Sequence, residues 1–186
     1  MQNMTDDTIK LSAFTTNTTD DVIELFTQSF GDAEGEAEGK VIGHLVSELI
    51  VTTPATDLLG FVATLENKIV GAIFFSRLAL AKKANAFILS PVAVSTAFQA
   101  KGIGQKLINF GLKQLKDNGV ELVFTYGDPN YYVKVGFNPI SEDCIKAPLI
   151  LTYPEGWLAQ SLVGTEIEPI EGDSFCVDAL NEQSYW

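Results

Sequence analysis

The residues best placed to do chemistry lie in a short turn before an amphipathic segment. Gln99-Ala100-Lys101-Gly102-Ile103-Gly104 follows an apolar run and opens a predicted helix. Glycines at the start of a helix leave backbone N–H groups approachable, and the positive end of the helix dipole points the same way. Anions bind well at such a helix start, and phosphate is the usual ligand. The turn therefore predicts a phosphate site built from the main chain.

Two common nucleotide-binding motifs do not fit this turn. A dinucleotide fingerprint needs a third glycine three residues after the second, and the chain has Leu107 there. A P-loop needs two glycines five residues apart followed by Lys and Ser or Thr, which neither Gly102-Ile103-Gly104 nor Gly39-Lys40-Val41 provides. The turn does fit the pattern Gln/Arg-x-x-Gly-x-Gly/Ala. On this turn alone, a plainer alternative stays open, in which the glycines only let the helix pack close to a strand.

A second motif follows the next predicted strand. Asp128-Pro129 begins a short helix, because proline is well suited to the first helical turn. The pair Tyr131-Tyr132 comes next, and Gly136-Phe137 ends the helix and starts another strand. Together with Val92-Ala93-Val94 and the glycine turn, this segment resembles the GCN5-related N-acetyltransferases (the GNAT family), and among them the small bacterial YhbS-like members. The resemblance covers the chain from about Ser90 to Phe137.

The resemblance implies an α/β protein with a single domain over residues 1–186 and the acyl-CoA N-acyltransferase fold. Its sheet would be mixed and twisted, with about seven strands flanked by helices. The sheet would be splayed at the cofactor site, between the strand ending at Val94 and the one ending at Tyr126. Pantetheine would enter this split and pair with backbone groups of Pro91–Val94, as an added strand does.

The resemblance also assigns the residues that bind acetyl-CoA, the implied cosubstrate, and it implies no metal. They belong to the strand end, the turn and the second motif: Val92, Ala93, Val94, Gln99, Ala100, Lys101, Gly102, Ile103, Gly104, Gln105 and Asn130. Tyr132, four residues before Gly136, would be the general acid, because a tyrosine hydroxyl with a pKa of about 10 can protonate a leaving thiolate. Tyr131 would point in a different direction from Tyr132 and would be a structural residue.

The implied reaction is direct transfer of an acetyl group from acetyl-CoA to an amine within one ternary complex, which depends chiefly on positioning. The segment Phe87–Ser90 offers no carboxylate as a general base. A water chain and the following side chains stay open as alternatives: Glu36, Glu38, Glu48, Asp128 and His44. Two other functions also stay open, a non-catalytic acyl-CoA-binding or interaction module of the same fold and a protein or peptide N-acetyltransferase.

Hydrophobic periodicity predicts the elements that position these motifs. Strands are expected over Ile9–Phe14, Leu59–Leu65, Ile69–Leu80, Phe87–Val94, Leu122–Tyr126 and Asp173–Ala179. Helices are expected from Thr18 to near Gly31, from about Glu38 to Thr52, and from Gly104 to the cap Asn118-Gly119. Because Phe87–Val94 is almost continuously apolar, it should be a central strand covered on both faces.

The acceptor cleft is expected between two further segments. Asp32–Gly39 carries four carboxylates and two glycines, which is typical of a loop that can move and attract a cation. Pro154–Leu158 is typical of an exposed aromatic turn. These segments give Glu36, Glu38 and Trp157 as candidate substrate residues. The alternatives are a solvated linker for the loop and a core position for Trp157.

Composition limits the possible partners. The net charge is −12, and a single arginine stands among the 12 Lys and Arg residues, which argues against nucleic acid because binding its phosphates needs a basic patch. No apolar run approaches the roughly 20 residues that span a bilayer, and Met1–Lys10 has no signal-peptide core. Cys144 and Cys176 match no metal spacing. We therefore expect a cytoplasmic protein with no nucleic-acid or membrane partner. The resemblance implies a small-molecule or peptide amine as the acceptor, and a homodimer is possible.

Overall fold

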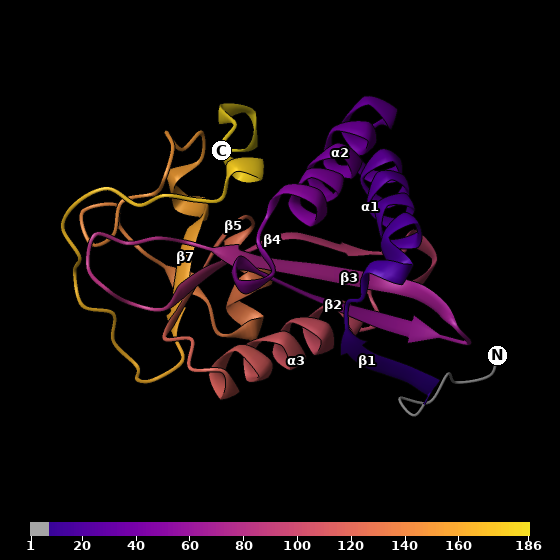
Figure 1. Cartoon of the computed structure of the whole chain (residues 1–186), viewed down its shortest axis with the longest axis horizontal. Coiled ribbons are helices and arrows are strands. Elements are labelled where there is room, and N and C mark those ends of the chain that lie inside the picture. Colours follow the sequence, from indigo (N-terminus) through magenta and orange to yellow (C-terminus); the bar gives the residue numbers. More distant parts are fainter. Residues whose placement is uncertain (1–7) are drawn as a thin grey trace.

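The computed structural model describes residues 8–186 and shows a seven-stranded sheet with helices on both faces (Figure 1). The strand order is β1-β2-β3-β4-β5-β7-β6. β4 and β5 pair in parallel, whereas the other neighbouring strands pair antiparallel. This confirms the predicted mixed sheet. The strands are β1 (Ile9–Ala13), β2 (Leu58–Leu65), β3 (Lys68–Arg77), β4 (Ala86–Val94), β5 (Leu122–Tyr126), β6 (Asn138–Pro139) and β7 (Trp157–Ser161).

The α-helices lie on the two faces of the sheet. α1 (Thr19–Glu34) and α2 (Glu36–Thr52) cover one face, α3 (Ile103–Asp117) covers the other, and the short α4 (Pro129–Tyr132) follows β5 (Figure 1). Single-turn 3-10 helices occupy Thr16–Thr18, Ala55–Asp57, Thr96–Phe98, Val133–Val135, Pro154–Gly156, Asp178–Leu180 and Gln183–Tyr185. None of the helices within residues 8–186 is long and apolar enough to cross a membrane.

The sheet separates two hydrophobic layers, because successive side chains of a strand point to opposite faces. On β3, Phe74 packs against Phe26 of α1, with ring centres 6.0 Å apart, whereas Phe75 packs on the α3 side. Both β3 rings are fully buried. The segment Ala86–Leu89 of β4 is also buried throughout, as its apolar sequence predicts. β4 therefore runs through the centre of the molecule.

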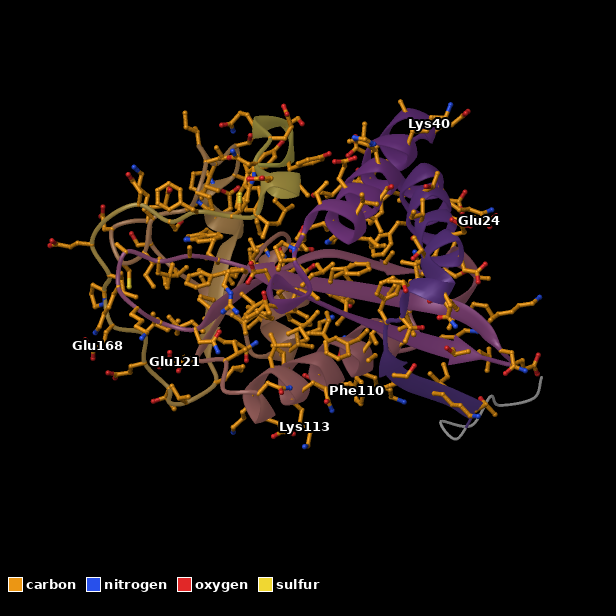
Figure 2. All side chains as sticks on the ribbon, viewed as in Figure 1. Glu24, Lys40, Phe110, Lys113, Glu121 and Glu168 are labelled. Carbon is orange, nitrogen blue, oxygen red and sulfur yellow. The ribbon has the colours of Figure 1, made fainter. Side chains whose placement is uncertain are left out.

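α3 shows the predicted amphipathic pattern. Its buried residues include the whole predicted inner face: Leu107, Ile108, Gly111, Leu112 and Leu115. Lys113 projects away from the sheet (Figure 2). The helix ends as predicted at Asn118-Gly119, where Gly119 takes a left-handed conformation (φ 82°) and the Val120 N–H bonds back to the Leu115 carbonyl. α3 thereby joins the parallel strands β4 and β5 in a βαβ unit.

The sheet opens between β4 and β5. These strands pair from Ala86–Leu89 against Leu122–Thr125, and β4 then continues to Val94 without β5. An extra residue near Ser90-Pro91 shifts the register of β4 against β3. Because a bulge bends and twists its strand, it turns the end of β4 away from β5. This arrangement confirms the predicted split.

The predicted loop over Asp32–Gly39 is wrong. α1 continues to Glu34 and α2 begins at Glu36, so that Gly35 (φ 105°) alone separates them. The reason is tertiary packing, because the two helices approach so closely that a Cβ on Gly39 would overlap the Thr27 carbonyl oxygen. The glycines that suggest flexibility in the sequence instead permit close contact between helices.

Trp157 is a core residue, so the predicted exposed turn is wrong and the alternative of a core position is confirmed. Its side chain is fully buried at the start of β7. The indole Nε1 donates a hydrogen bond to the Ile145 carbonyl (2.9 Å), and the ring stacks on Phe124 with centroids 5.1 Å apart. A residue held in this way cannot line an acceptor cleft.

The predicted strand over Asp173–Ala179 is also wrong. Phe175 makes an isolated bridge to Ala79, and the segment ends in the 3-10 turn Asp178–Leu180. Because β3 ends at Arg77, before Ala79, this segment has no sheet edge to extend along. The predicted strand after Gly136 likewise shrinks to the two residues of β6.

Gly39→Ala should destabilise the fold by about 2 kcal/mol, because the added methyl group forces α1 and α2 apart. The matched control is Gly31→Ala in the same contact, where the new Cβ would meet its neighbours at 3.9 and 4.0 Å. Alanine favours a helix over glycine by about 1 kcal/mol, so the control should be neutral or stabilising. Urea unfolding measures both variants, and equal free energies of unfolding would contradict this account of the helix contact.

Candidate functional site

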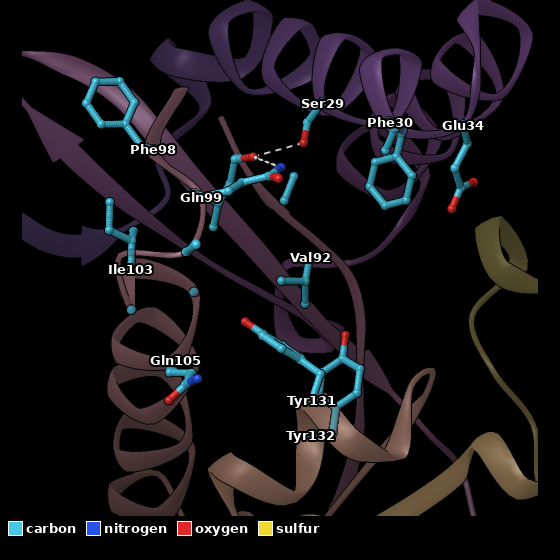
Figure 3. A pocket seen from close by; sticks show the side chains of 16 residues that line it. Ser29, Phe30, Glu34, Val92, Phe98, Gln99, Ile103, Gln105, Tyr131 and Tyr132 are labelled. Carbon is cyan, nitrogen blue, oxygen red and sulfur yellow. Dashed lines mark hydrogen bonds between the residues drawn. The ribbon is translucent and has the colours of Figure 1, made fainter. Parts of the chain in front are cut away.

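One cavity of about 430 Å³ brings the two sequence motifs together. It lies between α1, the end of β4, the start of α3 and α4 (Figure 3). The predicted site residues that line it are Val92, Ala93, Val94, Gln99, Ala100, Gly102, Ile103, Gly104, Gln105 and Tyr132. Phe98, Tyr131 and the α1 residues Ser29, Phe30, Ala33 and Glu34 complete the lining.

The turn before α3 presents backbone amides to this cavity. Ala100 and Gly102 both have a left-handed backbone, with φ angles of 59° and 79°. Gly102 caps α3, and the first turn of the helix has neither a side-chain cap nor an acidic residue. The first N–H groups of a helix have no partner within the helix, so those of Ile103 to Gln105 remain available. The geometry is that of an anion site at a helix N-terminus.

The end of β4 directs alternate backbone groups into the split. The Ser95 N–H donates to the Val70 carbonyl on β3 (2.8 Å), so the groups of Val94, and by alternation those of Val92, point away from β3. The Val94 carbonyl oxygen accepts hydrogen bonds from Ser29 Oγ (2.9 Å) and Gln99 Nε2 (3.0 Å) (Figure 3). The groups that remain for a bound molecule are the two N–H groups and the Val92 carbonyl.

Tyr132 places its hydroxyl at the inner end of the split. The hydroxyl lies near Thr125, whose Oγ1 donates to the Leu89 carbonyl (2.9 Å) at the last paired position of β4 and β5. Burial raises the pKa of Tyr132 to about 12, with smaller contributions from Tyr131 and Asp128, while the polar side chain of Thr125 acts in the opposite direction. Tyr132 is therefore protonated at neutral pH and can donate that proton.

Tyr131 points in another direction from the same short helix. Its ring stands nearly perpendicular to that of Tyr132, at an interplanar angle of 86° and a centroid distance of 5.0 Å. Its hydroxyl lies beside Gly104, where a Cβ would overlap it. Burial raises the pKa of Tyr131 as well. Tyr131 thus closes the cavity next to the start of α3, and this contact is a second reason for glycine at position 104.

Five predicted site residues lie outside the cavity: Lys101, Asn130, Glu36, Glu38 and Trp157. The Lys101 ammonium lies over the Phe98 ring, 5.4 Å from its centroid. Asn130 is exposed. Glu36 is exposed and pairs with Lys40 at 3.0 Å. Within residues 8–186, no three His, Cys, Asp or Glu side chains are grouped so that they could hold a metal ion.

The sequence interpretation missed the contribution of α1. Ser29, Phe30, Ala33 and Glu34 all come from its last turns. A signal for them exists, because their spacing continues the helical period that begins at Val22. The acidic and glycine-rich composition after Gly31 concealed it.

A smaller hollow lies at the split on the face that α2 covers. It is lined by Ile88 and Ser90 of β4, Tyr126 of β5, and Leu180, Tyr185 and Trp186. Its volume is about 20 Å³, which is room for about one water-sized group. Burial raises the pKa of Tyr185, followed by the charges of Glu182, Glu38 and Glu48. Three carboxylates therefore lie close enough to Tyr185 to affect its ionisation.

The comparisons with known proteins agree with this geometry. Residues 57–139 match the family model of the GNAT acetyltransferase domain. The chain is 31% identical over 164 residues to the uncharacterised N-acetyltransferase YjhQ of Escherichia coli K12, covering 85% of this chain and 86% of that protein. The chain therefore belongs to the GNAT family.

Two solved structures share the fold. The GNAT N-acetyltransferase YhbS of Escherichia coli, in complex with CoA, gives a TM-score of 0.75 at 21% identity and covers 94% of this chain and 92% of its own. A GNAT acetyltransferase from Brucella melitensis, in complex with acetyl-CoA, gives a TM-score of 0.72 at 23% identity and covers 93% and 98%. The seven-stranded open sheet is thus the architecture that the resemblance carried by the two motifs led us to expect.

Tyr132→Phe should flatten the loss of stability at high pH. The pKa of Tyr132 in the folded protein, about 12, lies above the ordinary value of about 10. The stabilising effect of the neutral hydroxyl is therefore complete below pH 10 and is lost as the pH rises from 10 to about 12. Urea unfolding across that interval measures it, with Tyr153→Phe as control because Tyr153 is 64% exposed. An equally steep decline in Tyr132→Phe and parent would refute the assignment.

Proposed function

We propose that this protein transfers an acetyl group from acetyl-CoA to an amine by direct attack within one ternary complex. The observation that carries the proposal is a single cavity lined by the glycine turn, the open edge of β4 and the side chain of Tyr132. Two proteins of the same fold contain CoA or acetyl-CoA in their structures. The family and the cavity chemistry thus support the same reaction.

The proposed cofactor placement follows the backbone groups of the cavity. The pyrophosphate lies on the amides of Gln99 to Gln105, where the helix start is free of acidic residues. The pantetheine arm runs along Val92 to Val94 and pairs with their free backbone groups. Lys101 contributes its N–H group, and Asn130 approaches the pantetheine arm from α4. One of the β4 amides polarises the thioester carbonyl, as oxyanion donors do.

Tyr132 is the proposed general acid for the departing thiolate. In water a thiol has a pKa of about 8.5, well below that of the buried Tyr132, about 12. Burial disfavours any anion, so a thiolate released into the same cavity also has a raised pKa. Burial therefore raises both pKa values, so the two groups are better matched for proton transfer than a comparison of buried Tyr132 with an aqueous thiol suggests. The loss of one hydroxyl should therefore affect the chemical step.

The acceptor is proposed to be a cationic amine that loses its proton before attack. Glu34 brings a carboxylate into the main cavity from α1, and Glu38 and Glu48 influence Tyr185 beside the small hollow. A net charge of −12 adds long-range attraction for a cation. We also propose a cytoplasmic location, because Cys144 and Cys176 are both free thiols and thiols persist in a reducing compartment.

Tyr132→Phe should keep the affinity for CoA and lower turnover by about 100-fold or more, since it removes the proton donor and little volume. Turnover is measured at saturating acetyl-CoA with the best amine from a screen of polyamines, amino acids, aminoglycosides and peptides. Tyr131→Phe removes a hydroxyl beside Gly104 and should act on the KM of acetyl-CoA instead. Full turnover in Tyr132→Phe with a rate limited by chemistry would exclude Tyr132 as the acid. Parental CoA binding with no turnover on any amine would favour the non-catalytic module.

Glu34→Gln should raise the KM of a cationic acceptor by about two- to fivefold and leave the KM of acetyl-CoA nearly unchanged, because an exposed charge pair is weak. Glu38→Gln should act in the same direction, while Glu36→Gln is the matched control, since Glu36 is exposed and paired with Lys40. Salt should raise the parental KM by screening these charges. A larger rise in the acceptor KM for Glu36→Gln than for Glu34→Gln would favour the acceptor site at Asp32–Gly39 that the sequence alone suggested.

A further inference from the structure

Two side chains of α1 hold the segment that leads from β4 into the glycine turn. Ser29 is 7% exposed, and its Oγ donates to the Val94 carbonyl at 2.9 Å. Asp32, almost one helical turn further along, accepts a hydrogen bond from Thr96 Oγ1 at 2.7 Å. These partners are 65 and 64 residues apart in sequence. α1 therefore fixes the position of a remote segment at two points.

The peptide group between Val94 and Ser95 is held on both sides. Its N–H donates to the Val70 carbonyl of β3 (2.8 Å). Its carbonyl oxygen accepts from Ser29 and from Gln99 Nε2 (3.0 Å), and a carbonyl oxygen has two lone pairs. Figure 3 shows Ser29 and Gln99 converging on this oxygen from different elements. With every polar group of the peptide occupied, its plane has a single orientation.

The orientation of this peptide affects the direction of the backbone N–H donors that precede and follow it. Val92 and Val94 present their N–H groups just before the peptide, and the amides of the turn follow it within the next ten residues, up to Gln105. Rotation of the peptide would redirect both sets of donors. The same turns of α1 carry Phe30, Ala33 and Glu34, which line the cavity. α1 is thus both a wall of the cavity and the anchor of its amide groups.

We propose that Ser29 and Asp32 are positioning residues, which hold the β4 edge and the glycine turn in the geometry that binds coenzyme A. They act through Val94 and Thr96 and do not touch the reacting atoms. The inference rests on the proposed placement of the pyrophosphate at the turn. It assigns to α1 a role in cofactor affinity in addition to its place beside the acceptor.

Ser29→Ala should weaken CoA binding, measured by calorimetry, by roughly three- to tenfold, as expected for one lost hydrogen bond to a buried group. The KM of acetyl-CoA should rise equally, while turnover at saturating acetyl-CoA changes by less than about twofold. Ser29→Thr keeps the hydroxyl and should restore most of the affinity. Thr27→Ala is the matched control on α1, because its hydroxyl donates to the Ile23 carbonyl of the same helix. It should leave CoA affinity unchanged.

A folded Ser29→Ala protein with parental CoA affinity would overturn the inference. If this variant does not fold, Asp32→Ala provides the same test at an exposed position, with Asp32→Asn as the variant that keeps an acceptor for Thr96. Gly104→Val distinguishes a failure of the positioning role from a failure of the proposed pyrophosphate placement. It is made in a Tyr131→Phe background, which removes the hydroxyl that would overlap the new side chain. Loss of CoA binding there, with parental binding in Ser29→Ala, refutes only the positioning role. Unchanged binding in the Gly104 variant refutes the placement of the pyrophosphate, and the positioning role with it.

Discussion

The separation of β4 from β5 beyond Leu89 and Thr125 is the constraint on which the site depends. A strand in the interior of a sheet normally has partners on both sides, and buried backbone groups without partners are costly. Here the end of β4 keeps β3 on one side, and on the other side the Val94 carbonyl is satisfied by Ser29 and Gln99. The polar groups that remain form an edge suited to an extended ligand. The opening is therefore a binding surface supplied by the fold itself.

The split has a lined space on each face of the sheet. Tyr132 packs in the layer of α3, whereas the small hollow of Tyr126, Tyr185 and Trp186 lies in the layer of α1 and α2. In direct transfer, the nucleophile approaches the carbonyl from one side and the leaving group departs in another direction. With Tyr132 as the proposed proton donor on one face, the proposed amine would approach from the other, where Glu38 and Glu48 influence Tyr185. The hollow, with a volume of about 20 Å³, has room for about one water-sized group.

Local signals explain how much of this could be predicted from the sequence. The glycine turn, α3 and the pair Asp128-Pro129 are each specified by neighbouring residues, through helix capping and periodicity, and the structure has them where they were expected. The split itself was predicted from the resemblance that the two motifs carry. The failures occur where distant contacts decide the outcome. The glycines near α2 looked like a loop, but the packing of Gly39 on Thr27 makes them a helix contact.

The C-terminal third shows the same limit. Nothing near Trp157 in sequence shows that Phe124 and Ile145 enclose it, and only these contacts distinguish a core tryptophan from an exposed one. Ser29 is a further case, because no local sequence pattern shows that this helical serine donates a hydrogen bond to a carbonyl 65 residues away. Residues that act through remote backbone groups are therefore found from the three-dimensional structure and not from local patterns.

Peptide groups cannot be removed by substitution, and this bears on how such a sequence diverges. A cofactor surface made of amides survives most changes of side chain in the turn, provided that the glycines and the shape of the backbone persist. Residues 29–34 of α1 line the same cavity, whereas residues 180–186 line the small hollow on the other side of the split. The α1 segment is tied to the approach to the turn by Ser29 and Asp32, so the segment 180–186 can vary more freely than α1. A chain of this design can exchange one amine for another over evolutionary time while it retains the same acyl donor.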